Sequence, residues 1–498
     1  MLPQPTVTIL ARDPPRKNPI NVVSYQQHAL LTANGYQYAV YYAAIPSSPQ
    51  STVYIHLSRR RLPSSEWDTI IFTDYPQTTD DGHNTVQLGV CPSDGTIHLA
   101  YDHHCDPLRY RVSVPGVATD PEKFKWDADL FTPTLDALPG IDRDHIPFGY
   151  ITYPRFCAAE KELFLTFRDG KAGLGDDHLY VYSPVTTTAN TAAVAETAKT
   201  GDGQGVEKGW TYLGPYLHGI LSNPYINALS YSPPTPRSRS FTTDPKDPDG
   251  GAQEEHGTLH VTLTWRGFVP YEGCHDPLDT KHKQQAGPNS AYNNHNICHT
   301  YSTDLGRTWR NTEGTIIANL ANDEAVSCES EGVTVFEIQK GSGLINQEGQ
   351  AAFREDVHVL MRERYDHHLK GLGQIEGYGI KQEDGDEGGV WWMHYHGQNG
   401  TWTRRPIKKV NGNLRGEVAV GNDGDVYFLL PDSMTPTLRI VKARRQDEFS
   451  TCQQVWEGEG FTGEPLVDPG RLEHGVLSLF VIVIVEGTRH IAVLDFQP

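Results

Sequence analysis

Short apolar runs alternate with turn residues along the whole chain. The segments NTVQLGVCPSDGTIHLAYDHH, YITYPRFCAAEKELFLTFRDG and EVAVGNDGDVYFLL each join two such runs through a turn, and VTVFEIQKG is paired with the later VHVLMRER. Such units recur roughly every 60 to 70 residues, a spacing typical of four-stranded propeller blades with insertions. The pattern predicts an all-β fold of repeated antiparallel sheets.

The two ends of the chain favour a single domain over residues 1–498. The last segment, VLSLFVIVIVEGTRHIAVLDF, is typical of a hairpin, which the N-terminal strand could complete as one blade. Because blades add around a ring, 498 residues need not divide into several domains. Pro184 to Val206 and Pro233 to Gly257 lack hydrophobic periodicity, so we predict inserted surface loops there.

One short motif marks the fold without indicating chemistry. Residues Ser302 to Trp309 read STDLGRTW, the S-x-D-x-G-x-T-W form of the Asp-box found on hairpin turns of sialidase-like propellers. Its Ser and Asp side chains can cap the turn, and its Trp can pack between strands. The motif therefore predicts a propeller hairpin.

The charge balance restricts the class of partner. The chain has 42 Lys and Arg against 62 Asp and Glu, a net charge of −20, which disfavours nonspecific nucleic-acid binding. No apolar run approaches the roughly 20 residues that a membrane span needs. The seven cysteines lack framework spacing, and the first residues show no signal-peptide pattern, which fits an intracellular protein or a chain that starts at a mature end. We expect a monomer with no nucleic-acid or membrane partner.

The first hairpin brings polar residues to one end of its blade. With a turn at Pro92–Gly95, a symmetric register places His83 opposite His104 and Asn84 opposite His103. A bulge would exchange His103 and His104. Such a histidine pair can be structural or catalytic.

The second hairpin repeats this arrangement. A turn at Ala159–Glu162 pairs Tyr153 with Arg168, again at the end opposite the turn. Two neighbouring hairpins would then present a His/His pair and a Tyr/Arg pair on the same face. Ordinary cross-strand packing is the other interpretation.

This set of side chains suits β-elimination next to a uronic acid. The C5 proton of a uronate is weakly acidic, so a cation must neutralise the carboxylate, which Arg168 can do bidentately. A base must remove that proton, and an acid must protonate the oxygen that leaves C4, roles open to His83, His104 and Tyr153. The chemistry requires no cofactor.

Candidate substrate-binding residues lie nearby and in later units. Tyr225 and Arg266 could bind a sugar by stacking and by charge, and Asn346 could bind a hydroxyl group. His103 and Asn84 are further candidates. The alternatives are an ordinary strand tyrosine, a surface arginine and turn-forming residues.

A cluster of cysteines and histidines suggests a structural metal. Cys274, His282, His295 and Cys298 are candidate zinc ligands, although no C-x₂-C spacing is present. Calcium held by loop carbonyls and Asp residues is the alternative.

Several segments, taken in order along the chain, resemble segments of a known protein family. They are GHNTVQLGVCPSDGTIHLAYDHHCDPLRYR, TYPRF, FRDGKAGLGDD, LHVTLTWRG, GLINQEG, and GEPLVDPGR followed by LSLF. Together they resemble the BNR-repeat propeller lyases, which comprise ulvan lyases and the L-rhamnose-α-1,4-D-glucuronate lyases that act on gum arabic-type arabinogalactan. The resemblance implies a seven-bladed β-propeller with a central active site on one face, secretion, and an anionic saccharide as substrate.

The resemblance also implies residue roles. His83 and His104 match the two family histidines, Tyr153 the tyrosine and Arg168 the carboxylate neutraliser, while base and acid stay unassigned and His103 could replace His104. No dense basic cluster for a sulfate is evident near the site. We therefore favour cleavage of unsulfated, terminal rhamnosyl-glucuronate, which releases L-rhamnose and leaves a 4,5-unsaturated glucuronate.

Other functions fit a propeller. An ulvan lyase would use the same chemistry on a sulfated polymer. A sialidase-like hydrolase would need an arginine cluster and a Tyr/Glu nucleophile pair, and the chain has one Asp-box and no Phe-Arg-Ile-Pro segment near its start. A noncatalytic carbohydrate-binding propeller would not need His83, His104 and Tyr153 together.

Overall fold

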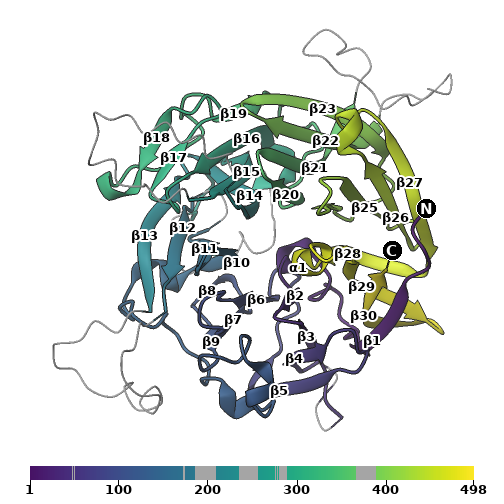
Figure 1. Ribbon diagram of the computed structural model, residues 1–498. Coiled ribbons are helices and arrows are strands. Elements are labelled where there is room, and N and C mark those ends of the chain that lie inside the picture. The colour runs from purple at the N-terminus through teal and green to yellow at the C-terminus, as the bar shows by residue number, and fades with distance from the viewer. Residues whose placement is uncertain are drawn as a thin grey trace, which may run out of the picture.

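The strands of this protein are arranged radially around a central axis (Figure 1). The computed structural model describes residues 1–46, 49, 51–171, 174–184, 209–234, 256–274, 276, 279, 289–365 and 389–497. Over these ranges the strands form seven antiparallel sheets, which confirms the predicted all-β, seven-bladed propeller. Most of the two predicted loops, at Pro184 to Val206 and Pro233 to Gly257, lies outside the described residues.

The first three blades come from the N-terminal part of the chain. Blade 1 contains β2 (Leu30–Ala33), β3 (Tyr36–Ala43), β4 (Val53–Arg61) and β5 (Asp68–Gln77). Blade 2 contains β6 (Val86–Val90), β7 (Ile97–Tyr101) and β9 (Tyr110–Val112). Blade 3 contains β8 (His104–Asp106), β10 (Ile151–Ala159), β11 (Glu162–Arg168), β12 (Asp177–Tyr182) and β13 (Trp210–Leu217).

The next three blades follow in chain order. Blade 4 contains β14 (Ser222–Ser232), β15 (Thr258–Gly267), β16 (Asn294–Ser302), β17 (Thr308–Arg310), β18 (Ile316–Asn319) and β19 (Thr334–Phe336). Blade 5 contains β20 (Gly349–Phe353), β21 (Asp356–Tyr365), β22 (Gly389–Gln398) and β23 (Thr401–Lys409). Blade 6 contains β24 (Glu417–Val420), β25 (Val426–Asp432), β26 (Thr437–Ala443) and β27 (Cys452–Glu459).

Blade 7 joins the two ends of the chain. It contains β28 (Phe461–Val467), β29 (Leu477–Val485), β30 (Thr488–Phe496) and, outermost, β1 (Thr6–Arg12). β1 pairs with β30 from Thr6↔Asp495 to Arg12↔His490, which confirms the predicted closure by the N-terminal strand. This pairing closes the ring and covers the outer edge of the terminal hairpin.

The described helices lie in the connections between strands. The described α-helix is a single turn, α1 (Pro469–Leu472), and the 3-10 helices are η1 (Ser24–Gln26), η2 (Pro121–Lys123), η3 (Ala128–Leu130), η4 (Ile146–Gly149), η7 (Ala291–Asn293), η8 (Leu320–Asn322) and η10 (Arg445–Asp447). None of the described helices has the length and apolar character needed to cross a membrane.

The Asp-box forms the predicted turn between β16 and β17. Ser302 Oγ accepts a hydrogen bond from the Gly306 N–H (2.8 Å), and Asp304 Oδ1 accepts one from the Thr308 N–H (2.9 Å). Trp309 is fully buried, and its Nε1 donates to the Gly306 carbonyl (3.1 Å). The motif therefore has the structural role expected of it.

One predicted strand pair was wrong. VTVFEIQKG contributes β19, which pairs with β16 in blade 4, whereas VHVLMRER lies in β21 and pairs with β20 in blade 5. β16 contacts β17 through the pair Tyr301↔Arg310, so its opposite half is free to bind β19. β20 has the sequence GQAAF, whose small side chains give a weak strand pattern, and its pairing with β21 was therefore missed.

The order of strands decides which residues meet at the centre. The first strand of each main hairpin is innermost, as Figure 1 shows for β2, β6, β10, β14, β20 and β28. These strands run in the same direction along the axis, so their starts lie on one face, and the ends of the antiparallel second strands lie on that face too. We call it the active-site face.

Candidate active site

The predicted site residues occupy equivalent positions in their blades. They stand at or near the starts of innermost strands or the ends of second strands: His83 before β6, Tyr153 in β10, Tyr225 in β14, Asn346 before β20, Arg168 in β11 and Arg266 in β15. Strand direction alone therefore places them all on the active-site face. Ring, guanidinium and hydrogen-bond contacts show that the structure also brings them together, from four consecutive blades.

A carboxylate holds the two predicted histidines in a stack. Asp81 Oδ1 lies 2.6 Å from His83 Nδ1, and Oδ2 lies 2.7 Å from His104 Nδ1. The two ring centroids are 4.0 Å apart with an interplanar angle of 17°. When each Nδ1 donates to the carboxylate, each Nε2 is left with a lone pair for a proton. Sequence reasoning missed Asp81, although its place two residues before His83 in DDGHN was visible.

Protonation in this group is set by burial and by the shared carboxylate. Burial alone would raise the pKa of Asp81, yet the hydrogen bonds from His104 and His83 outweigh it and hold that pKa well below its usual range. Burial, together with the adjacent His104, lowers the pKa of His83 to about 4. His83 is therefore a neutral imidazole at neutral pH.

The register predicted for the first hairpin was wrong beyond its regular strands. Pairing between β6 and β7 ends at Val86↔Tyr101, and His104 belongs to β8, where it pairs with Thr152 of blade 3. The chain leaves blade 2 because Asp102 and Cys105 adopt left-handed backbone conformations (φ 64° and 56°). The histidines thus meet between two blades.

His103 and Asn84 lie beside this connection. His103 is buried, and its Nε2 accepts a hydrogen bond from the Arg109 N–H (2.9 Å). Asn84 Nδ2 donates to Asp102 Oδ1 (2.9 Å). These contacts hold the connecting segment itself, and a role of either residue in substrate binding stays a prediction.

A bulge, absent from the predicted register, positions Tyr153. Arg168 pairs with Thr152 and not with Tyr153, because the register shifts between Thr152 and Arg155. Tyr153 has a positive φ of 59°, a strained conformation that turns its side chain out of the regular alternation. Its ring centroid nevertheless lies 5.2 Å from the Arg168 guanidinium carbon.

Arg168 is a buried cation with unused donors. Its exposed fraction is 2%, and among the described residues its Nε and Nη1 have no hydrogen-bond partner. Burial would lower its pKa, but the adjacent Tyr225 and Tyr153 outweigh this and raise it, so the group stays charged. Because buried donors of a charged group are costly to leave without partners, this guanidinium is suited to bind an anion.

The two tyrosines beside Arg168 differ in acidity. Burial and the neighbouring Tyr25 and Tyr225 raise the pKa of Tyr153 well above its usual value, so Tyr153 keeps its proton. Burial would also raise the pKa of Tyr225, but Arg266 and Arg168 outweigh burial and lower it. The Arg266 guanidinium carbon lies 4.2 Å from the Tyr225 ring centroid, and its Nη1 is 3.2 Å from the hydroxyl oxygen.

Two residues of the site come from the parts of the chain before β2 and β24 and were not predicted. Tyr25 of η1 stacks on His83, with ring centroids 4.7 Å apart. Arg415, just before β24, donates to the Tyr25 hydroxyl (2.8 Å) and pairs with Glu464 (3.1 Å). Because Tyr25 and Arg415 are far apart in sequence, no local pattern could have indicated their contact.

The expectation that the site lacks a basic cluster was wrong. Arg168, Arg266 and Arg415 all contact the aromatic group formed by Tyr25 and Tyr225. Arg266 is held by neutral side chains, its Nη2 donating to the side-chain oxygen of Asn346 (2.8 Å) and its Nε to that of Asn294 (2.7 Å). The site therefore combines three cations contributed by separate blades.

A buried glutamate borders this group and gives a prediction about stability. Glu348 precedes β20, is 1% exposed, and accepts a hydrogen bond from the Arg362 N–H (2.7 Å). Burial raises its pKa to about 7, although Arg362 opposes this. The folded protein therefore holds a proton here that the unfolded chain releases at lower pH.

At each pH, the melting temperature of Glu348→Gln is compared with that of wild type. We expect this difference to rise by a few degrees in favour of the variant as the pH increases from the ordinary pKa of a glutamic acid to above 7. The proton on Glu348 stabilises the folded state fully below its ordinary pKa, and that contribution is lost as the pH rises through about 7. Glutamine stays neutral throughout. Thermal melts of both proteins across this range test the prediction, and a difference independent of pH would contradict it.

The predicted metal ligands are only partly described. His282 lies outside the described residues. Cys298 packs in the core of blade 4, where burial raises its thiol pKa to about 12, and His295 Nε2 lies 3.3 Å from Ser222 Oγ. Cys274 is buried. Within the part of the chain that is described, these residues form no group of three ligands, and the metal site stays a prediction.

Two other groups have the composition and spacing of a metal site. They are Asp81, His83 and His104 at the active-site face, and Asp356, His358 and His396 elsewhere. In the first group both Nδ1 atoms already bond the carboxylate, an arrangement equally suited to proton transfer. All seven cysteines are free thiols, in agreement with the absence of a disulfide pattern.

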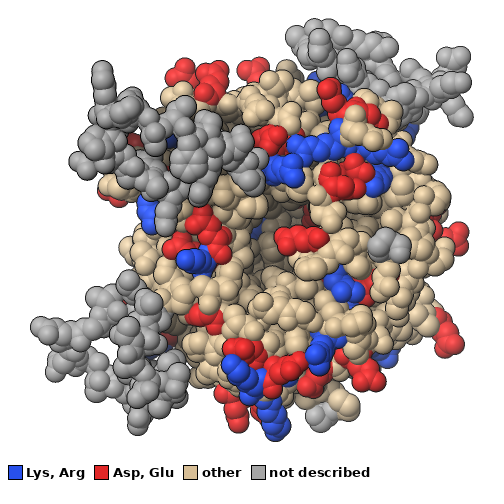
Figure 2. Space-filling model, viewed as in Figure 1, with Lys and Arg blue, Asp and Glu red and all other residues tan. Residues whose placement is uncertain are grey.

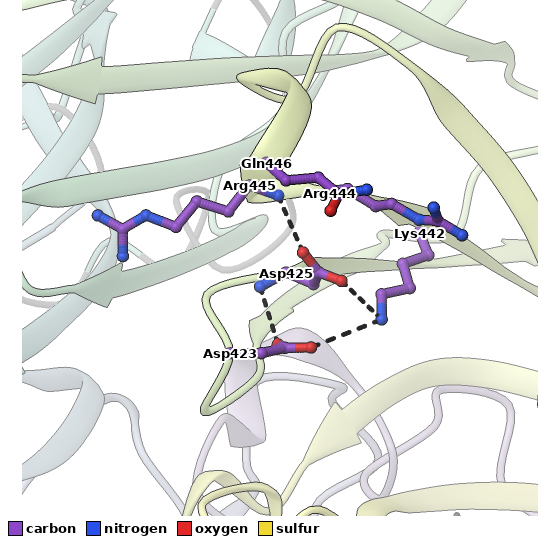
Figure 3. A pocket seen from close by; sticks show the side chains of 6 residues that line it. All are labelled: Asp423, Asp425, Lys442, Arg444, Arg445 and Gln446. Atoms are coloured by element: carbon purple, nitrogen blue, oxygen red, sulfur yellow. Dashed lines mark hydrogen bonds and ion pairs between the residues drawn. The ribbon is translucent and has the colours of Figure 1, made fainter.

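A separate pocket is lined by residues that belong to neither the Arg168 site nor the Asp81-bound histidines. It has a volume of about 540 Å³ and is lined by Asp423, Asp425, Lys442, Arg444, Arg445 and Gln446 (Figure 3). Its two carboxylates are paired with one lysine, since Lys442 Nζ lies 2.8 Å from Asp425 Oδ2 and 3.8 Å from Asp423 Oδ2, and the backbone N–H of Arg445 donates to Asp425 Oδ1. Figure 2 likewise shows acidic and basic side chains interspersed around a hollow at the centre of the ring. We place the chemistry at Arg168 because unpaired donors and histidines meet there.

Sequence comparison now places the chain among known proteins. The family model described as a BNR repeat-containing family member matches residues 36–410. The chain belongs to this BNR-repeat family. A segment of 158 residues is 28% identical to an ulvan lyase, long isoform, from Alteromonas sp, and one of 107 residues is 30% identical to an ulvan lyase, short isoform, from Alteromonas sp. (strain LOR).

These two ulvan lyases match the chain over short segments. The two segments cover 26% and 16% of this chain, and 16% and 20% of the two relatives. The crystal structure of polysaccharide lyase Uly1 matches over 100% of this chain and 99% of its own, with 14% sequence identity and a TM-score of 0.63. That structure shares the propeller fold.

Proposed function

We propose that this BNR-repeat protein is a polysaccharide lyase that cleaves the rhamnose-α-1,4-glucuronate linkage by β-elimination. The observation that carries the proposal is Arg168, a buried guanidinium with two unpartnered nitrogens beside Tyr153 and the Asp81-bound histidines. An anion-binding cation, a neutral base and a protonated acid in one site are the three groups that this reaction needs.

Arg168 would bind the uronate carboxylate. Its Nε and Nη1 have no partner among the described residues, and a guanidinium can bind both oxygens of a carboxylate through an adjacent pair of N–H groups, Nε with Nη2 or Nη1 with Nη2. This contact strengthens as the C5–H bond breaks, because negative charge then develops on the carboxylate as an enolate-like intermediate. Tyr225 lies with its ring centroid 5.0 Å from the Arg168 guanidinium carbon and would limit the orientations of that guanidinium.

His83 or His104 would remove the C5 proton through Nε2. Each ring has Nδ1 on Asp81, so the imidazolium that forms is stabilised by an adjacent carboxylate. Tyr153 would protonate the C4 oxygen, since it keeps its proton at neutral pH. The electron pair of the C5–H bond forms the C4=C5 double bond as the C4–O bond breaks. The products are L-rhamnose and a chain ending in 4,5-unsaturated glucuronate.

Ulvan is the second candidate substrate. The similarity of two segments to ulvan lyases supports it, as do the additional cations Arg266 and Arg415, which could bind a sulfate. The bond cleaved and the catalytic residues would be the same for both polymers. Secretion, a monomeric state and an anionic saccharide partner belong to the same proposal.

Near-ultraviolet absorbance during incubation with gum arabic arabinogalactan, and separately with ulvan, tests the proposal. We expect a rise with gum arabic together with release of free rhamnose, because the unsaturated uronate absorbs there. A rise with ulvan alone would retain β-elimination and change the substrate. New reducing ends without absorbance would indicate a hydrolase, and binding without any product a noncatalytic propeller.

A further inference from the structure

A second group of ligand-type side chains lies at the face opposite the active site. β20 starts on the active-site face, so its hairpin turn into β21 lies at the other end of blade 5. Asp356 and His358 stand at the start of β21, and His396 lies near the end of β22. Neither the predicted metal site nor the proposed reaction uses these residues.

The three side chains converge on one point. His358 and His396 are cross-strand partners, and their rings stack with centroids 4.8 Å apart and an interplanar angle of 6°. Asp356 Oδ1 lies 2.8 Å from His396 Nε2. One ligand atom of each of the three lies within 4.8 Å of the other two. This spacing is compatible with three ligands around a single ion.

His358 presents an unused nitrogen to this point. Its side chain is fully buried, and its Nε2 has no hydrogen-bond partner among the described residues. Its Nδ1 lies 3.0 Å from His394 Nε2. With Nδ1–H donating to His394, the Nε2 lone pair is free, and the ring is held by an outer hydrogen bond as metal-binding histidines usually are. A buried nitrogen without a partner would otherwise be unfavourable.

We propose that Asp356, His358 and His396 bind a divalent transition-metal ion, with Zn²⁺ as the reference ion. Two imidazoles and one carboxylate suit Zn²⁺ and other divalent first-row transition metals, whereas Ca²⁺ and Mg²⁺ prefer oxygen ligands. On binding, His396 gives up its hydrogen bond to Asp356, and its proton moves from Nε2 to Nδ1. The ring stays neutral, and a fourth ligand position is left for water.

The site would join two blades. Arg445 Nη2, from blade 6, lies 3.0 Å from Asp356 Oδ2, and Figure 3 shows the Arg445 side chain pointing away from the Asp423 and Asp425 carboxylates. Phe449, also from blade 6, contacts His358 and His396 edge-on with ring centroids 4.7 and 4.8 Å away. His396 is 15% exposed and offers an entry path for the ion. The metal would stabilise the interface between blades 5 and 6, whatever reaction the other face performs.

Counting bound ions tests the proposal. Full-length protein is treated with a chelator, freed of it, and titrated with Zn²⁺ by calorimetry. We expect His396→Asn and Asp356→Asn to bind one ion fewer per chain than wild type, and Zn²⁺ to raise the melting temperature of wild type more than that of either variant. Equal ion counts in wild type and folded variants would overturn the proposal.

His218→Asn is the matched control. His218 also bonds an aspartate, with Nδ1 2.8 Å from Asp176 Oδ1, but belongs to no three-ligand group among the described residues. It should bind as many ions as wild type. Should the blade 5 variants fail to fold, anomalous diffraction at the zinc edge from Zn²⁺-soaked wild-type crystals decides the question. A peak between His358 Nε2 and His396 Nε2 supports the site, and its absence there refutes it.

Discussion

Arg168→Lys is expected to lower kcat/KM on the preferred rhamnosyl-glucuronate polymer by about 10²–10³-fold, the usual effect of removing a donor that stabilises developing negative charge. Lysine keeps the positive charge but cannot donate the two parallel hydrogen bonds of a guanidinium. Its ammonium group would also lie in a site shaped by Tyr153 and Tyr225 around a planar group. Initial rates of the near-ultraviolet rise measure the effect.

Arg111→Lys is the control for this experiment. Arg111 is a buried arginine of β9 whose Nη2 lies 2.5 Å from Asp74, away from the site. We expect its activity to stay close to that of wild type. Near-normal activity of Arg168→Lys, in a folded protein, would mean that another group neutralises the carboxylate, and Arg266 would then be the first to replace.

Tyr153→Phe is expected to lower kcat by about 10²–10⁴-fold, the range for loss of a general acid. The substitution removes only the hydroxyl, so the ring contacts with Tyr25 and Tyr225 are retained and KM should change little. Burial raises the pKa of Tyr153 well above its usual value, which keeps the acid protonated at the pH of the assay. Steady-state kinetics that separate kcat from KM check this result.

Tyr101→Phe provides the matched comparison. Tyr101 is also buried, but its hydroxyl donates to Thr134 Oγ1 (2.8 Å), a residue of the connection after β9 that is not part of the proposed site. Its kcat should equal that of wild type. An unchanged kcat in Tyr153→Phe would assign the acid role to a histidine, whereas a raised KM at constant kcat would make Tyr153 a binding residue.

Local sequence patterns determined the fold. Apolar alternation broken by Asp-Gly turns defined the hairpins, and the turns at Pro92–Gly95 and Ala159–Glu162 form as predicted. The Asp-box turn could be predicted because its hydrogen bonds join residues at most a few positions apart. The terminal hairpin and its completion by β1 followed from the same alternation at the chain ends.

The sequence also determined most of the polar residues that meet at the site. In a propeller, the start of a first strand and the end of a second strand share a face, so His83, His104, Tyr153 and Arg168 could be grouped from hairpin geometry. Their detailed pairing could not, because a bulge at Tyr153 and the left-handed residue Asp102 depend on packing between blades.

Only the tertiary structure decided the remaining contacts and the protonation states. Ring closure brings Tyr25 of the first blade against Arg415 of the sixth, a contact with no local signal. The second metal-type group depends on cross-strand pairing of His358 with His396 across a long chain segment. Acidity differs between Tyr153 and Tyr225 because burial and nearby arginines act on them unequally. Such effects depend on the distances between residues that are far apart in the sequence, and a local sequence pattern does not encode those distances.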